Sequence, residues 1–214
     1  MVDGPVVTVR GEAYREVEPE VARFAVTALA RDRDREVTLT RLAERAAAVR
    51  VLLDSAEPAI DRRETGDLRV RPETRRSGER VVAWHGSVVT TVTVSDFTAL
   101  GELMLRLADQ DQVEVAGPWW SLRPDSPTYR EARQAAITDA LQRAREYAEA
   151  LGAQVTDLIE LADEGGTAQP MMARVAFDAG GAAGGPPQLE LDPQPQGVHA
   201  AVRARFSISR PVLT

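Results

Sequence analysis

The sequence predicts an α+β fold in which helices cover one face of a largely antiparallel sheet. Stretches with alternating apolar residues indicate strands, and stretches with an apolar residue every three or four positions indicate helices. The order of these stretches is the third observation. A strand, helix and strand near residues 20–76 are followed by a similar unit near 81–122, and one long helix and a final strand complete a single domain over residues 1–214.

The first part of the chain predicts two strands and a helix. The strands lie near residues 5–16 and 20–30, and Pro19 separates them because proline interrupts a strand. Asp34 is the expected N-cap of the helix, and Pro58 lies just past its end. The expected buried stripe of this helix consists of Leu39, Leu42, Ala46, Val49 and Leu53.

A hairpin and a short helix are predicted next. The hairpin turns at Ser77 and Gly78, and its long β-branched second strand runs through Val94. Ser95 or Asp96 caps the following helix, and a strand that contains two adjacent tryptophans comes after it. The apolar residues of this helix are Phe97, Leu100, Leu103, Met104 and Leu107.

The longest helix has the clearest boundaries, with Ser126 as N-cap, Pro127 at its first position and Gly152 at its end. A further strand follows, and then residues 163–197 are so rich in glycine and proline that we expect a flexible loop. Residues 198–208 alternate as in a half-buried strand. One face of the long helix carries Tyr129, Ala132, Ala136, Ala140, Ala144, Ala148 and Leu151.

Composition excludes several classes of function. The formal net charge is −7, so nucleic acid and anionic membranes are not expected partners. The chain has no cysteine, and His85 and His199 are its only histidines, so we expect no metal site and no cofactor. No segment has the apolar length of a membrane span, and no signal peptide is visible, which predicts a cytoplasmic protein.

Three stretches share their pattern with one family. The opening strands carry Gly11, Glu12, Val17, Pro19 and Ala22. A Gly-x-x-aromatic-x-Leu pattern is formed by Gly117, Trp120 and Leu122. The long helix contributes Ala136, Asp139, Ala140, Arg143, Ala144, Leu151 and Gly152. On the basis of these stretches the chain resembles the SIMPL family, and the resemblance extends over nearly its whole length.

The resemblance implies more about fold than about activity. Bacterial members of the family are typically exported or periplasmic, are linked to envelope or oxidative stress, and assemble into oligomers. The family has no established catalytic residues. We therefore expect a homo-oligomeric protein that is not an enzyme, and the absence of a visible signal peptide sets this chain apart from the exported members.

The adjacent tryptophans predict a contact surface. Because neighbouring side chains of a strand point to opposite faces, Trp119 and Trp120 cannot share one core. Trp120 occupies the aromatic position of the family and is the expected core residue. Trp119 is expected to pack either at a subunit contact or under the Gly/Pro-rich loop, with Pro118 suited to an edge strand. Met171 and Met172 offer a second adaptable contact in that loop.

A small-molecule or anion-binding protein, or an enzyme, is the alternative function. Its binding pocket would combine Trp84 and His85 with the arginines of the hairpin, because guanidinium groups bind carboxylates and phosphates in a bidentate manner. A solvated hairpin is the competing interpretation of the same residues. The candidate anion-binding residues are Arg69, Arg71, Arg75, Arg76 and Arg80.

Overall fold

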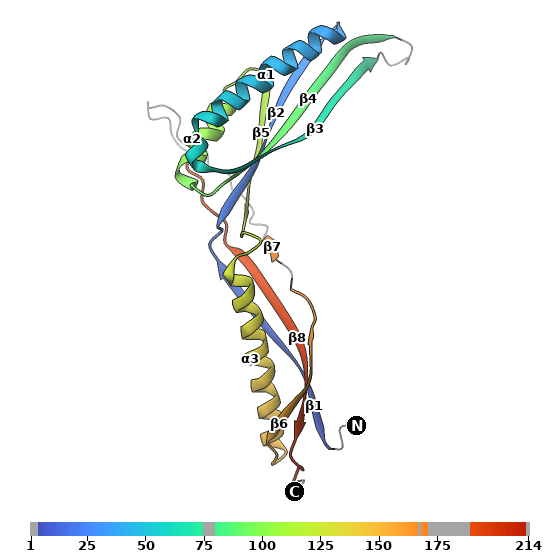
Figure 1. Cartoon of the computed structure of the whole chain (residues 1–214), viewed down its shortest axis with the longest axis vertical. Coiled ribbons are helices and arrows are strands. Elements are labelled where there is room, and N and C mark those ends of the chain that lie inside the picture. The colour runs from blue at the N-terminus through green and yellow to red at the C-terminus, as the bar shows by residue number, and fades with distance from the viewer. Residues whose placement is uncertain (1–3, 75–79, 167, 171–188, 213–214) are drawn as a thin grey trace, which may run out of the picture. The chain divides into compact units, whose positions relative to one another are not determined.

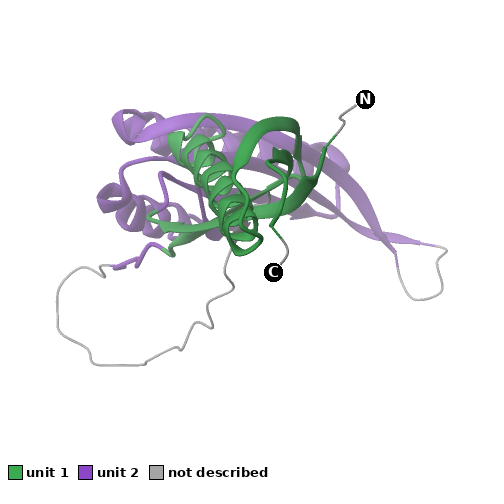
Figure 2. Cartoon of the chain, turned by 90° about the horizontal axis from the view of Figure 1, so that it is seen from below, with its two compact units in different colours: residues 1–18, 122–173, 194–214 green, residues 19–121, 174–193 purple. Residues whose placement is uncertain are grey.

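A computed structural model describes residues 4–74, 80–166, 168–170 and 189–212 of the chain. It confirms the α+β class with antiparallel strands, but these strands form two four-stranded sheets rather than one. The chain accordingly divides into two compact units, shown in green and purple in Figure 2. Unit 1 contains residues 1–18, 122–173 and 194–214, and unit 2 contains residues 19–121 and 174–193.

Unit 2 holds the two expected strand, helix and strand units, and its sheet has the strand order β3-β4-β2-β5. Helices α1 and α2 pack on one face of this sheet (Figure 1). The elements in chain order are β2 (Val21–Asp32), α1 (Arg35–Ser55), the short 3-10 helix η1 (Glu57–Ala59), β3 (Ile60–Thr74), β4 (Val81–Val94), α2 (Phe97–Ala108) and β5 (Val113–Ser121).

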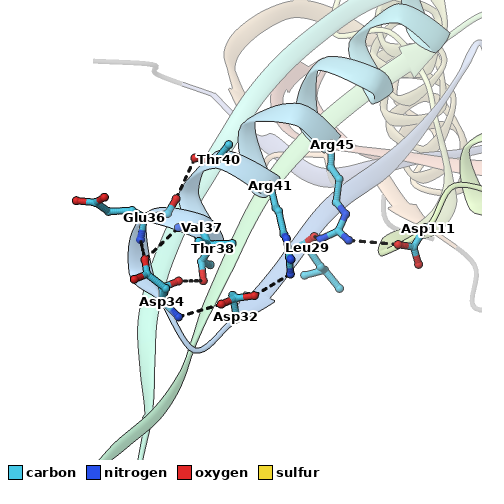
Figure 3. Close-up of polar contacts among 10 residues, drawn as sticks. All are labelled: Leu29, Asp32, Asp34, Glu36, Val37, Thr38, Thr40, Arg41, Arg45 and Asp111. Carbon is cyan, nitrogen blue, oxygen red and sulfur yellow. Dashed lines mark hydrogen bonds and ion pairs between the residues drawn. The ribbon is translucent and has the colours of Figure 1, made fainter.

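The helices of unit 2 begin where the sequence predicts, because aspartate side chains accept the amide protons that the first turn leaves unpaired. Asp34 caps α1 by accepting hydrogen bonds from the amides of Glu36 and Val37 (Figure 3). Asp96, one of the two expected caps of α2, accepts from the amides of Thr98 and Ala99.

The core of unit 2 lies between its sheet and its helices. Every second residue of β2 and β4 faces the helices, and the largest fully buried side chains of this core are Phe24, Leu53, Leu100, Leu107, Val26, Val92 and Val94. The intervening residues of the strands face the other side of the sheet. Among them, Ala25, Thr27, Ser87 and Val89 are half-buried.

Unit 1 contains the long helix and the two chain ends. Its central strand β8 pairs with β1, β6 and β7, all antiparallel. Helix α3 runs along the sheet and packs on β1 and β8 (Figure 1). The elements are β1 (Val6–Val17), α3 (Pro127–Ala150), β6 (Val155–Asp163), β7 (Ala168–Pro170) and β8 (Gln196–Ile208).

Alanines form the buried face of α3, as expected. Ser126 caps the helix, Pro127 is its first residue, and Gly152 follows its end with a positive φ of 66°. The short side chains let the helix approach β1 closely at Gly11, where a Cβ atom would overlap the carbonyl oxygen of Ala136. The buried alanines are Ala132, Ala136, Ala140, Ala144 and Ala148.

The division into two sheets follows from the partner of the first strand. The strands on either side of Pro19 do not form a hairpin, because β1 pairs with β8 and β2 pairs with β4 and β5.

Whether the whole chain folds as the single expected domain stays a prediction. Most of the expected loop over residues 163–197 lies outside the described residues, and its described part includes β7 and the first residues of β8.

None of the described helices combines the length and the apolar character that crossing a membrane requires.

Candidate functional site

The two adjacent tryptophans lie on β5, an edge strand of the sheet of unit 2, and face opposite ways. Trp120 packs against the core and makes an edge-to-face contact with Phe97, with ring centroids 4.8 Å apart. Trp119 pairs with Arg23 across the sheet and keeps 52% of its surface exposed. The predicted division of the pair is confirmed, and unit 2 presents an indole that no core residue covers.

A β-bulge shapes the edge strand just before Trp119. The pairing of β5 with β2 shifts between Arg23 and Ala25, opposite Gly117 and Pro118. Gly117 has a φ of 123°, and a Cβ atom there would lie 3.0 Å from the carbonyl oxygen of Arg23, so glycine is required at this position. Because Pro118 has no amide proton, the edge cannot donate a hydrogen bond to a further strand at this point.

The face of the same sheet that α1 and α2 leave uncovered carries a hollow of about 300 Å³. Strands β2, β3 and β4 form its floor and sides, and Gln112 reaches it from the segment before β5. The residues that line the hollow are Leu29, Ala30, Arg31, Arg69, Arg71, His85, Gly86, Ser87 and Gln112.

One carboxylate organises two of the side chains around this hollow. Glu73 Oε2 accepts a 2.9 Å hydrogen bond from Arg31 Nε, forms an ion pair with Arg31 Nη2 at 2.8 Å, and lies 2.7 Å from His85 Nε2. The hydrogen bond with His85, followed by that with Arg31, lowers the pKa of Glu73 below its ordinary value. Glu73 therefore stays ionised and fixes the positions of the guanidinium and the imidazole ring.

The candidate anion-binding arginines are found in three different situations. Arg69 and Arg71 both line the hollow, and Arg69 also forms an ion pair with Asp67. Arg80 is exposed and does not line the hollow. Arg75 and Arg76 lie outside the described residues, and so do Met171 and Met172 of the expected second contact.

The structure corrects the expectation that Trp84 and His85 form one pocket. As neighbours on β4, they face opposite sides of the sheet. His85 lines the hollow, whereas the ring of Trp84 lies on the helix side, 5.6 Å from the guanidinium carbon of Arg35 at the start of α1. Trp84 thus takes part in a cation–π contact that helps to hold the helix.

The sequence-based candidates did not include Arg31 and Ser87, which line the hollow, or Glu73, which binds Arg31 and His85 beside it. Arg31 and Glu73 are 42 positions apart and belong to strands that do not pair with each other, so no local spacing signals their contact. Ser87 did carry a signal, because it lies two residues after His85 on a predicted strand and must share its face.

Fold and site define a protein of antiparallel sheets covered by helices, with its candidate functional residues on unit 2. The chain belongs to the SIMPL family, described as a protein of unknown function (DUF541), which matches residues 7–206. No curated protein matches the chain.

Two solved structures show low similarity. A "putative amidohydrolase/peptidase" from Burkholderia cenocepacia is 18% identical and has a TM-score of 0.31, over 61% of this chain and 34% of that chain. An "unknown protein" from Galdieria sulphuraria is 13% identical with a TM-score of 0.25, over 88% of this chain and 84% of that chain. This chain spans about a third of the first structure's length.

Several of the residues that carry the family resemblance lie in unit 1, where two of them bind the backbone of β1. Asp139 on α3 accepts a hydrogen bond of 2.9 Å from the backbone amide of Glu12. Arg143, one turn further on, donates a 2.9 Å hydrogen bond to the carbonyl oxygen of Arg10. These side chains satisfy backbone groups on the outer edge of β1, which protects this edge from pairing with another strand.

Proposed function

We propose that this protein is a non-enzymatic, self-associating member of the SIMPL family whose copies meet at the β5 edge of unit 2. The exposed indole of Trp119 carries the proposal. Covering an aromatic side chain of this size contributes about 1–3 kcal/mol, so a second copy that buries Trp119 gains stability from one residue.

The shape of the edge favours contact through side chains over continuation of the sheet. Pro118 offers no amide proton, and the bulge at Gly117 interrupts the regular spacing of backbone groups next to Trp119. A partner copy therefore covers the indole face rather than adding a strand along β5.

The non-enzymatic part of the proposal is supported by the sequence and by His85. The chain has no cysteine, only two histidines and no G-x-S-x-G nucleophile motif. His85 shares the Glu73 carboxylate with Arg31, an arrangement that suits a structural histidine. We further propose a role in the bacterial response to envelope or oxidative stress, which the resemblance to the SIMPL family supports. The cytoplasmic location expected from the sequence stays a prediction.

Sedimentation velocity over a dilution series tests the self-association. Wild-type protein should form an oligomer that dissociates on dilution, and Trp119→Ala should raise the dissociation constant by about tenfold or more, since each 1.4 kcal/mol is a factor of ten. Tyr147→Ala is the matched control, because Tyr147 is an aromatic residue of unit 1 with 59% of its surface exposed. A monomer at every concentration, or equal effects of both substitutions, would contradict the proposal.

A further inference from the structure

The hollow on the uncovered face of unit 2 collects positive charge on an acidic protein. Three arginines line it, Arg31, Arg69 and Arg71, while the chain as a whole carries a formal charge of −7. Among the described residues that line the hollow, none has a carboxylate. The strand register brings Arg31 and Arg71 close to each other, because both pair with His85, from opposite sides of β4.

The three guanidinium groups differ in how far neighbouring carboxylates neutralise them. Glu73 binds Arg31, and Asp67 binds Arg69. The side chain of Arg71 forms no ion pair or hydrogen bond with another described residue. With Glu73 and Asp67 included, the three arginines leave one positive charge uncompensated at the hollow, and its centre is Arg71.

The other groups at the hollow fit a small oxyanion. Ser87 can donate from its hydroxyl and Gln112 from its side-chain amide, so both can bind an oxygen atom. Leu29, Ala30 and Gly86 supply apolar and backbone surface but no competing charge. Because Glu73 already holds Arg31 in a fixed position, binding an anion beside it requires little further ordering of that side chain.

From this arrangement we infer that the hollow is a binding site for a small oxyanion, a carboxylate or phosphate group, with Arg71 as its principal ligand. Arg71 binds the anion in the bidentate manner of guanidinium groups. Arg69, Ser87 and Gln112 contribute further donors. Trp119 does not line the hollow, so the inference does not rest on the proposed self-association.

The test is an NMR titration of ¹⁵N-labelled protein with sodium phosphate and, separately, with sodium acetate, each at an ionic strength held constant with sodium chloride. Both anions should cause saturable shifts of the Arg71 side-chain Nε–H signal and of the Ser87 and Gln112 amides. Arg71→Gln should weaken the affinity by about tenfold or more, because it removes a charged hydrogen-bond donor. Arg71→Lys keeps the positive charge but lacks the planar guanidinium group, so its affinity for the anion should lie between those of the wild-type protein and Arg71→Gln.

Arg62→Gln is the matched control. Arg62 lies on the same strand β3 and pairs with Glu64, but it does not line the hollow, so its replacement removes one positive charge without touching the site. Saturation by only one of the two anions supports the site and narrows its ligand to that class. Shifts that never saturate, or an equal loss of affinity in Arg62→Gln and Arg71→Gln, would overturn the inference.

Discussion

Units 1 and 2 both pair helices with a four-stranded antiparallel sheet, but they fill the space between helix and sheet differently. In unit 1 a row of alanines on α3 brings the helix so close to β1 that Gly11 has no room for a Cβ atom. In unit 2 the space under α1 and α2 is filled by larger side chains, Phe24 and several leucines. Substitutions that add atoms between helix and sheet should therefore destabilise unit 1, and substitutions that remove buried atoms should destabilise unit 2.

The two units also differ in the residues they hold: unit 1 has family residues with a structural role, and unit 2 has the candidate functional residues. The recurrent residues of the family that meet in unit 1, such as Gly11, Ala140 and Asp139, serve the close packing of α3 on β1. The exposed Trp119 and the hollow around Arg71 belong to unit 2. Family membership thus explains how the chain folds, and the surface of unit 2 is where its activity is to be sought.

The largest effect is expected from truncating the core of unit 2. Phe24 is fully buried, so Phe24→Ala should lower the free energy of unfolding by about 3–5 kcal/mol, measured by urea denaturation. Leu68→Ala removes an apolar side chain from the same sheet that is 65% exposed, and it should change the value by less than about 0.5 kcal/mol. Similar losses of stability for Phe24→Ala and Leu68→Ala would contradict a core of unit 2 that depends on large buried side chains.

A smaller loss is expected when one methyl group is added to unit 1. Gly11→Ala places a Cβ atom against the backbone of α3, which should cost about 1–3 kcal/mol of unfolding free energy in the same assay. Gly4→Ala is the control in the same unit, because nothing lies within 4 Å of a Cβ atom there. If Gly11→Ala is as stable as the control, the helix and β1 are not in close contact.

The smallest effect concerns acid stability at the hollow. Hydrogen bonds from His85 and Arg31 lower the pKa of Glu73, so ionised Glu73 stabilises the folded state above the ordinary carboxyl pKa of 4.5. This contribution is lost as the pH falls below 4.5 through the lowered folded-state pKa. Wild-type protein should therefore lose its stability advantage over Glu73→Gln in acid, as urea denaturation at a series of pH values would show. Parallel stability curves would argue against the Glu73 contacts.

Local signals in the sequence were enough to predict the elements of the fold. Caps at Asp34 and Ser126 and the glycine after α3 depend only on neighbouring residues, and strand alternation placed Trp119 and Trp120 on opposite faces. Leu39, expected on the buried stripe of α1, is exposed near the start of that helix, where a periodic pattern no longer guarantees burial.

The arrangement of the strands and the composition of the hollow could not be predicted in this way. Nothing near Val6 in the sequence indicates that its partner is Ser207, and the contact of Arg31 with Glu73 depends on the registers of three strands. A shared pocket for Trp84 and His85 conflicts with strand geometry, because the alternation that separates Trp119 from Trp120 applies equally to these two neighbours on β4.

The pairing of β1 with β8 also sets the order in which the protein can mature on the ribosome. Strand β1 is synthesised before all the other described elements, but its partner β8 is complete only when Ile208 has been added. All four strands of the unit 2 sheet are available once Ser121 has emerged. During translation β1 therefore stays without its partner strand until every other described element has been synthesised.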